Sequence, residues 1–186
     1  MGVGGLGAAA RLRIFGEATE SDDMNRLIPT SLNTTVFIVV SLLLAACSDE
    51  PPATLLKINF ADAKLPAAVA ALSGFSSPEP WGRWSDANVA PTAKIQFKKP
   101  LPKDFALTVT GQAMPNNEVA VVKIGSFQDQ IELQKLGDSS TIDVNLDQPA
   151  DTIEIIPSEP VSPKKLGLND DSRKLGVGLE TLQIKQ

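Results

Sequence analysis

The sequence predicts an all-β domain, an antiparallel β-sandwich of jelly-roll-like type with about eight short strands, preceded by a signal peptide. Two observations predict the sandwich. Short segments rich in β-forming residues recur at spacings near a dozen residues, separated by Pro, Gly, Asn and Asp. No long stretch after residue 54 shows a helical period. The 186 residues are 42% hydrophobic, which suits one domain of common size.

Eight segments are expected to be strands: 55–60, 92–98, 105–112, 118–125, 130–135, 141–146, 152–156 and 176–184. Every second residue of the segment 141–146 is apolar, which places Ile142, Val144 and Leu146 on one buried face. The alanine-rich segment 65–72 has two interpretations. It forms either two helical turns or an irregular edge strand.

The composition excludes several classes of site. The chain has no histidine and a single cysteine, which removes His-based acid/base catalysis, Cys/His zinc sites and any internal disulfide. The net charge is -5, and the lysines are scattered between carboxylates, so we expect no binding to nucleic acid. We expect no cofactor.

Residues 24–46 have the three zones of a secretory signal, a basic start, an apolar run and a small-residue end. The string Leu44-Ala45-Ala46-Cys47 resembles the lipobox of bacterial lipoproteins, in which the cysteine thiol is acylated before cleavage. Cys47 is therefore the predicted lipidation site, and residues 47–54 are the predicted lipidated tether. The alternative is a plain membrane span, but a span needs about 20 mostly apolar residues and polar residues interrupt the longer window.

The position of the signal sets the domain boundaries and the expected location. Residues 1–23 carry four acidic residues before the apolar run, so we interpret them as a mis-assigned N-terminal extension. Residues 55–186 are the expected β-sandwich domain. The resemblance to lipoproteins implies a lipid anchor in the cell envelope, facing the periplasm. It favours the outer membrane over the inner one, because Ser48 stands where an inner-membrane lipoprotein tends to carry aspartate.

Two clusters are the candidate functional residues. Residues 77–86 contain both tryptophans of the chain, and residues 169–176 place an arginine beside carboxylates. A tryptophan face suits stacking on a sugar ring, while arginine and carboxylates can hydrogen-bond the hydroxyls. The candidate ligand-binding residues are Glu79, Trp81, Arg83, Trp84, Asp86, Asp171 and Arg173.

Other interpretations of the same clusters remain open. The tryptophans can plug one end of the sandwich, with an arginine–aspartate pair fixing a corner, or they can anchor a protein partner. Asn169, Asp170 and Asp171 are possible calcium ligands, although a turn explains them more simply, and we expect no metal site. Two carboxylates such as Glu79 and Asp86 would suffice for glycoside hydrolysis. No serine, threonine or lysine nucleophile has an identifiable base beside it, so we expect no enzyme.

The tryptophan string also carries a family resemblance. It looks like an uncharacterised bacterial domain that is often appended to membrane phosphoglycerol transferases and glycosyltransferases. The matching residues are Glu79-Pro80-Trp81-Gly82-Arg83-Trp84-Ser85-Asp86, Pro100-Leu101-Pro102, Asn116, Gly125, Pro157, Ser162-Pro163 and Asp171-Ser172-Arg173-Lys174-Leu175-Gly176. The resemblance implies a β-sandwich outside the cytoplasmic membrane and assigns no catalytic residues.

The expected function is a non-catalytic, lipid-anchored envelope accessory module that binds a cell-envelope glycan. The alternative is a structural or assembly lipoprotein that docks on a membrane glycosyltransferase or phosphoglycerol transferase. The free-standing lipoprotein form differs from the fused arrangement of the family.

Overall fold

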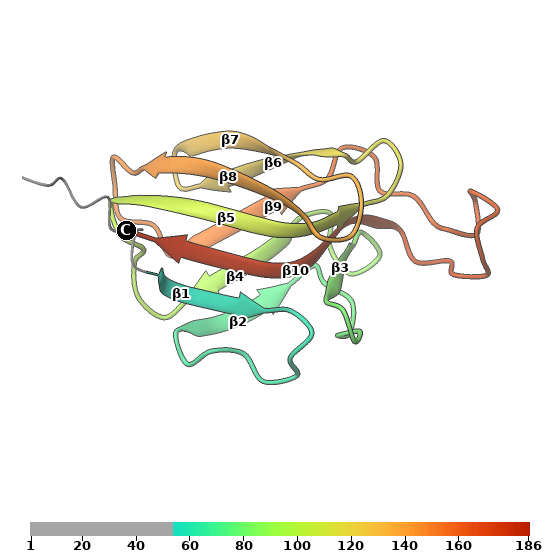
Figure 1. Cartoon of the computed structure of the whole chain (residues 1–186), viewed down its shortest axis with the longest axis horizontal. Helices are drawn as coiled ribbons and strands as arrows, with labels where there is room; N and C mark the ends of the chain where they lie inside the picture. The colour runs from blue at the N-terminus through green and yellow to red at the C-terminus, as the bar shows by residue number, and fades with distance from the viewer. Residues whose placement is uncertain (1–53) are drawn as a thin grey trace, which may run out of the picture. The chain divides into compact units, whose positions relative to one another are not determined.

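The computed structural model describes residues 54–186, which fold as a sandwich of two five-stranded antiparallel sheets (Figure 1). The predicted N-terminal extension, signal peptide, lipidation site at Cys47 and tether before Thr54 lie outside the described residues and stay predictions. Within residues 54–186, no helix is long and apolar enough to cross a membrane.

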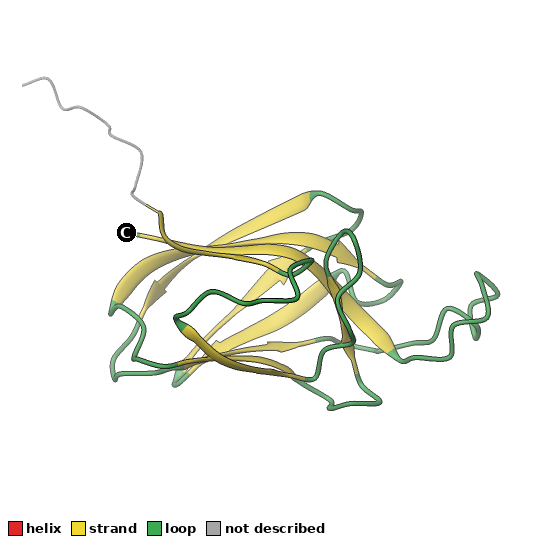
Figure 2. Ribbon diagram, turned by 90° about the horizontal axis from the view of Figure 1, so that it is seen from below, coloured by secondary structure: helices red, strands yellow, loops and turns green. Residues whose placement is uncertain are grey.

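The two sheets draw their strands alternately from the chain. The first sheet has the order β1 (Thr54–Asn59), β10 (Leu175–Lys185), β5 (Asp104–Ala113) and β8 (Asp138–Asn145), and β3 (Arg83–Asp86) also pairs with β10. The second has the order β2 (Val69–Ser73), β4 (Ala93–Phe97), β9 (Thr152–Ile156), β6 (Val119–Ile124) and β7 (Phe127–Glu132). Apart from the β6–β7 hairpin, each strand is followed by one in the opposite sheet, as in a jelly roll (Figure 2).

The core lies between the sheets and follows the period of two in the strands. In β4, Ala93, Ile95 and Phe97 are buried while the residues between them are exposed. The predicted inward face of β8 is confirmed, since Ile142 and Val144 belong to the buried cluster. Both sheets and the apolar layer between them come from residues 54–186. We therefore expect this part of the chain to fold without the residues that precede it.

Two strands were not among the eight expected ones. The helical interpretation of residues 65–72 is wrong, and the edge-strand alternative is confirmed, because Val69–Ser73 pairs with β4 and buries Val69. Alanine is a good helix former, and this local preference is overridden by pairing at the sheet edge. The four-residue strand β3 gives little local signal, and its pairing with β10 sustains it. The strand expected at 130–135 lies instead at Phe127–Glu132.

Strand β10 extends from the strand-β3 end of the first sheet to the start of β1. Its Lys185 pairs with Thr54 at the start of β1, and its Gly178 pairs with Trp84 of β3. Gly178 and Lys185 are seven positions apart in the strand, which corresponds to about 23 Å. The N-terminal start of the domain and the tryptophan string therefore lie toward opposite ends of the sandwich (Figure 1).

Candidate functional site

A hairpin over residues 74–86 displays the tryptophan string. At its tip, the N–H of Glu79 donates to the carbonyl of Gly82 at 2.8 Å, and the N–H of Gly82 donates back to Glu79 at 3.1 Å. This pair of hydrogen bonds leaves Pro80 and Trp81 as the two residues of the turn. Proline has a fixed φ and no N–H to satisfy, so it suits this turn. Trp81 is thereby held at the tip of the hairpin.

Both indoles pack over Gly178 on the outer surface of the first sheet. The neighbours of Gly178 along the strand, Val177 and Leu179, are fully buried in the core, so the side-chain position of Gly178 faces outward. A Cβ atom on Gly178 would lie 2.5 Å from Cη2 of Trp81 and 3.0 Å from Cε3 of Trp84. The two rings meet edge to face, with centroids 5.2 Å apart and an interplanar angle of 72°. Both tryptophans remain half-buried.

A network of polar side chains joins the hairpin to the loop before β10. The Nε1–H of Trp81 donates to Oε2 of Glu79 at 3.0 Å. Nη2 of Arg173 donates to Oε1 of Glu79 at 3.1 Å and to Oδ2 of Asp171 at 2.6 Å. Nε of Arg173 also donates to both carboxylate oxygens of Asp171. The structure thus brings Glu79, Trp81, Asp171 and Arg173 into one connected group beside Trp84.

The opposite charges of Asp171 and Arg173 each stabilise the ionised form of the other side chain. The hydrogen bonds from the Arg173 side chain lower the pKa of Asp171, and the same pairing raises the pKa of Arg173. Both groups are therefore fully ionised at neutral pH. No residue of 54–186 accepts a hydrogen bond from Nη1 of Arg173.

Two residues of the predicted set, Arg83 and Asp86, make hydrogen bonds to the backbone away from this network. Nε and Nη2 of Arg83 donate to the carbonyls of Phe60 and Asp62 at 3.0 and 2.9 Å, and burial lowers the pKa of Arg83. Asp86 is 5% exposed, and its carboxylate accepts the N–H of Asn88 at 2.9 Å in a turn. Arg83 holds the β1–β2 loop and Asp86 caps the end of β3, so we leave both out of the proposed site.

The second cluster forms a turn. The N–H of Asp171 donates to Oδ1 of Asn169 at 2.8 Å, and the Asp171 carboxylate accepts hydrogen bonds from the Arg173 side chain. Within residues 54–186, no three His, Cys, Asp or Glu side chains are placed to hold a metal ion. The geometry favours the turn interpretation of these residues.

The sequence interpretation missed Gly178, on which the indole pair depends. Its signal was the string Gly176-Val177-Gly178 at the start of a predicted strand. A glycine inside a strand often marks the close approach of another group, here the two indoles.

Part of this chain is similar in sequence to known proteins. Phosphoglycerol transferase I of Escherichia coli O139:H28 (strain E24377A / ETEC) is 37% identical over 122 residues, which is 64% of this chain and 16% of the transferase. Phosphoglycerol transferase I of Shigella boydii serotype 18 (strain CDC 3083-94 / BS512) gives the same values. The chain thus corresponds to a small part of each of these relatives.

This chain is also similar to a solved structure, and it matches a protein family. A family 35 carbohydrate binding module from an environmental isolate has a TM-score of 0.42 and 8% identity, over 71% of this chain and 93% of the module. Residues 50–186 match the family described as Domain of unknown function (DUF7024). This chain therefore belongs to the family Domain of unknown function (DUF7024).

Proposed function

We propose that this protein is a non-catalytic, lipid-anchored accessory module of the cell envelope that binds a glycan through Glu79, Trp81, Trp84, Asp171 and Arg173. One observation carries the proposal. Two half-buried indoles lie together over Gly178, directly beside an ionised network of carboxylates and a guanidinium. An indole offers a flat apolar face for a sugar ring, and the fixed charges offer acceptors and a donor for its hydroxyls.

The similarity to phosphoglycerol transferase I supports a glycan related to phosphoglycerol as the ligand. The segment shared with phosphoglycerol transferase I is a small part of that protein, so the activity in the transferase's name does not pass to this chain. A module that accompanies such a protein would bind a glycan that receives or carries phosphoglycerol. Anionic substituents of this kind would suit the Nη1 donor of Arg173.

The predicted anchor supports the location. The lipobox-like string before Cys47 would attach the module to the membrane, facing the periplasm, with Ser48 favouring the outer membrane. An anchored module meets envelope polymers at a high local concentration.

The geometry of the carboxylates supports a binding role over catalysis. Glycoside hydrolysis uses one carboxyl group with a raised pKa as the acid, facing a second carboxylate across a groove. Glu79 and Asp171 instead contact the same guanidinium, and the pKa of Asp171 is lowered. Asp171 is therefore not a proton donor at neutral pH.

Tryptophan fluorescence tests the proposal, because both tryptophans of the chain belong to the site. The fragment 48–186 is titrated with glucans that carry or lack phosphoglycerol and with lipopolysaccharide oligosaccharides. We expect a saturable spectral shift with one class. Arg173→Ala should weaken binding about tenfold or more, since it removes a charge-assisted donor.

The matched control breaks another half-exposed ion pair. Lys94 and Glu154 pair at 2.7 Å on the second sheet, away from the indoles, so Lys94→Ala should leave the titration unchanged. A blue-shifted emission that no glycan alters would contradict the proposal. It would indicate that the indoles are a structural plug.

A second candidate is docking on a membrane glycosyltransferase or phosphoglycerol transferase. It is favoured by the match to a segment of phosphoglycerol transferase I, which shows that such a domain also occurs joined to a transferase. Tryptophan and arginine are also frequent anchors of protein interfaces. Crosslinking from residue 81 in intact cells would identify a transferase if this candidate holds, and glycan alone if it does not.

A further inference from the structure

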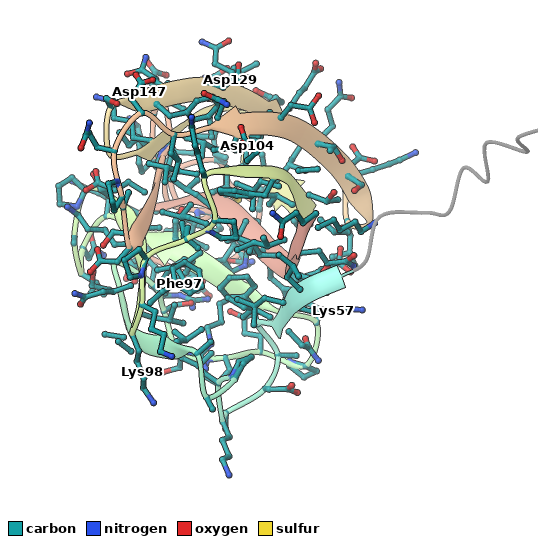
Figure 3. All side chains as sticks on the ribbon, turned by 90° about the vertical axis from the view of Figure 1, so that its left-hand side faces the viewer. Lys57, Phe97, Lys98, Asp104, Asp129 and Asp147 are labelled. Carbon is teal, nitrogen blue, oxygen red and sulfur yellow. The ribbon has the colours of Figure 1, made fainter. Side chains whose placement is uncertain are left out.

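An apolar cavity lies at the end of the sandwich opposite the indoles. Its volume is about 430 Å³, and it lies where β1 begins and β10 ends. Figure 3 looks onto this end, with Phe97 near its middle. Most of the lining is aliphatic, aromatic or proline side chains, including Leu55, Leu56, Phe97, Pro100, Leu101 and Ile184.

The rim of this cavity is basic although the chain as a whole is acidic. The net charge of the chain is -5, yet the only charged residues that line the cavity are Lys98 and Lys99. The acidic side chains Asp104 and Asp147 lie on the other side of this end (Figure 3). A smaller neighbouring cavity of about 260 Å³ includes Asp147 in its lining, so the purely basic rim belongs to the larger one.

The start of the domain lies beside this cavity. Leu55, the second residue of β1, lines the cavity and is 50% exposed. Cys47 precedes Thr54 by seven residues, which span at most about 25 Å. A membrane that holds the predicted anchor at Cys47 is therefore within reach of the cavity.

We propose that this cavity takes an acyl chain of an anionic phospholipid, whose headgroup pairs with Lys98 and Lys99. The apolar lining accommodates the chain and the two lysines match the charge of the headgroup. The acyl groups of an anchor on Cys47 carry no charge for these lysines to pair with. A lipid anchor combined with a basic surface is also the arrangement that gives stable attachment to a membrane. The indoles then lie about 23 Å away along β10, on the side that faces the envelope polymers.

Vesicle binding by the fragment 48–186 tests the proposal without the predicted anchor. Because Cys47 is absent from this fragment, the outcome is independent of lipidation, and because the indoles are distant, it is independent of glycan binding. Flotation is measured with vesicles of phosphatidylcholine alone and of phosphatidylcholine with phosphatidylglycerol. We expect binding only to the anionic vesicles, weakened by salt.

A pair of lysine variants tests the rim. Lys98→Gln with Lys99→Gln should weaken binding about thirtyfold, since each lysine near an anionic surface contributes to the affinity. Lys164→Gln with Lys165→Gln removes the same charge from an exposed segment between β9 and β10 and should have little effect. Circular dichroism confirms that both variants fold.

Entry of an acyl chain into the cavity is tested with a single labelled cysteine in its lining. The fragment has no cysteine of its own, so Leu55→Cys can carry an environment-sensitive fluorophore. Its emission should shift to the blue on anionic vesicles. The control Leu168→Cys, which is 64% exposed and lies between β9 and β10, should not shift. Equal binding to neutral vesicles, equal losses from both lysine pairs, or no shift at position 55 would each overturn the proposal.

Discussion

Nη2 of Arg173 lies 3.1 Å from Oε1 of Glu79 and joins the loop before β10 to the tip of a hairpin 94 residues earlier. The other oxygen of Glu79 accepts the indole N–H of Trp81. One carboxylate therefore orients both an indole and a guanidinium. This contact makes a single surface of two clusters that are far apart in the sequence.

A side chain at position 178 should lower the stability of the domain. In Gly178→Ala the new Cβ would meet the benzo edges of both indoles, so the rings must move or the sheet must distort. We expect a loss of about 1 to 3 kcal/mol in the free energy of unfolding, together with a changed emission maximum. Urea unfolding followed by tryptophan fluorescence measures both. Gly167→Asn is the control, because nothing lies within 4 Å of that position and its φ of 72° is close to the left-handed region in which asparagine is enriched.

Arg83 should matter for stability and not for ligand affinity. Arg83→Ala removes two hydrogen bonds to the carbonyls of Phe60 and Asp62, which hold the β1–β2 loop against β3. We expect a loss of about 1 to 3 kcal/mol in chemical denaturation, partly restored in Arg83→Lys. The folded fraction should bind glycan with unchanged affinity. A loss of affinity without a loss of stability would instead return Arg83 to the ligand site.

Asp171 should stabilise the fold in a pH-dependent way. Its pKa is lower in the folded protein than in the unfolded chain, because Arg173 stabilises the carboxylate. The contribution is therefore fully present above the unfolded pKa of about 3.9, and it disappears as the pH falls through the folded pKa. Asp171→Asn should lower stability at pH 7 and make no difference at the acid limit.

Urea unfolding at a series of pH values measures the effect of Asp171→Asn. Asp170→Asn is the neighbouring control, since the Asp170 side chain is fully exposed and its contact with Lys164 is long, at 3.9 Å. A difference at Asp171 that is independent of pH would contradict the assignment to the ion pair.

Asn117 should be the most sensitive polar residue of the domain. It is 0% exposed, accepts the N–H of Glu159 at 2.8 Å, and donates to the carbonyls of Pro115 and Glu159. Asn117→Leu leaves these backbone groups without partners, so we expect a loss of about 3 kcal/mol or more in thermal or chemical unfolding. Asn116→Gly should change stability by about 0.5 kcal/mol or less, because Asn116 is exposed and its φ of 67° suits glycine.

The sequence by itself determined the fold class and most of the strands. Alternation of apolar residues, as in Ile142 and Val144, is a property of the strand alone, and it marks the buried face before any partner is known. The absence of histidine and the single cysteine likewise exclude His-based catalysis, Cys/His zinc sites and an internal disulfide without a structure. The tryptophan string is recognisable in the sequence because both tryptophans and an arginine fall within a few residues.

Only the tertiary structure decided which groups the side chains of the two clusters contact. Arg83 and Arg173 are both arginines beside carboxylates in the sequence, yet one holds the backbone of the β1–β2 loop and the other reaches Glu79. The difference arises from the register of β10 against β1 and β3, which sets the neighbours of each side chain. The hydrogen bond between residues 94 positions apart forms because β3 pairs with β10 within the first sheet, which brings the hairpin before β3 next to the loop before β10. Local sequence patterns do not predict this pairing.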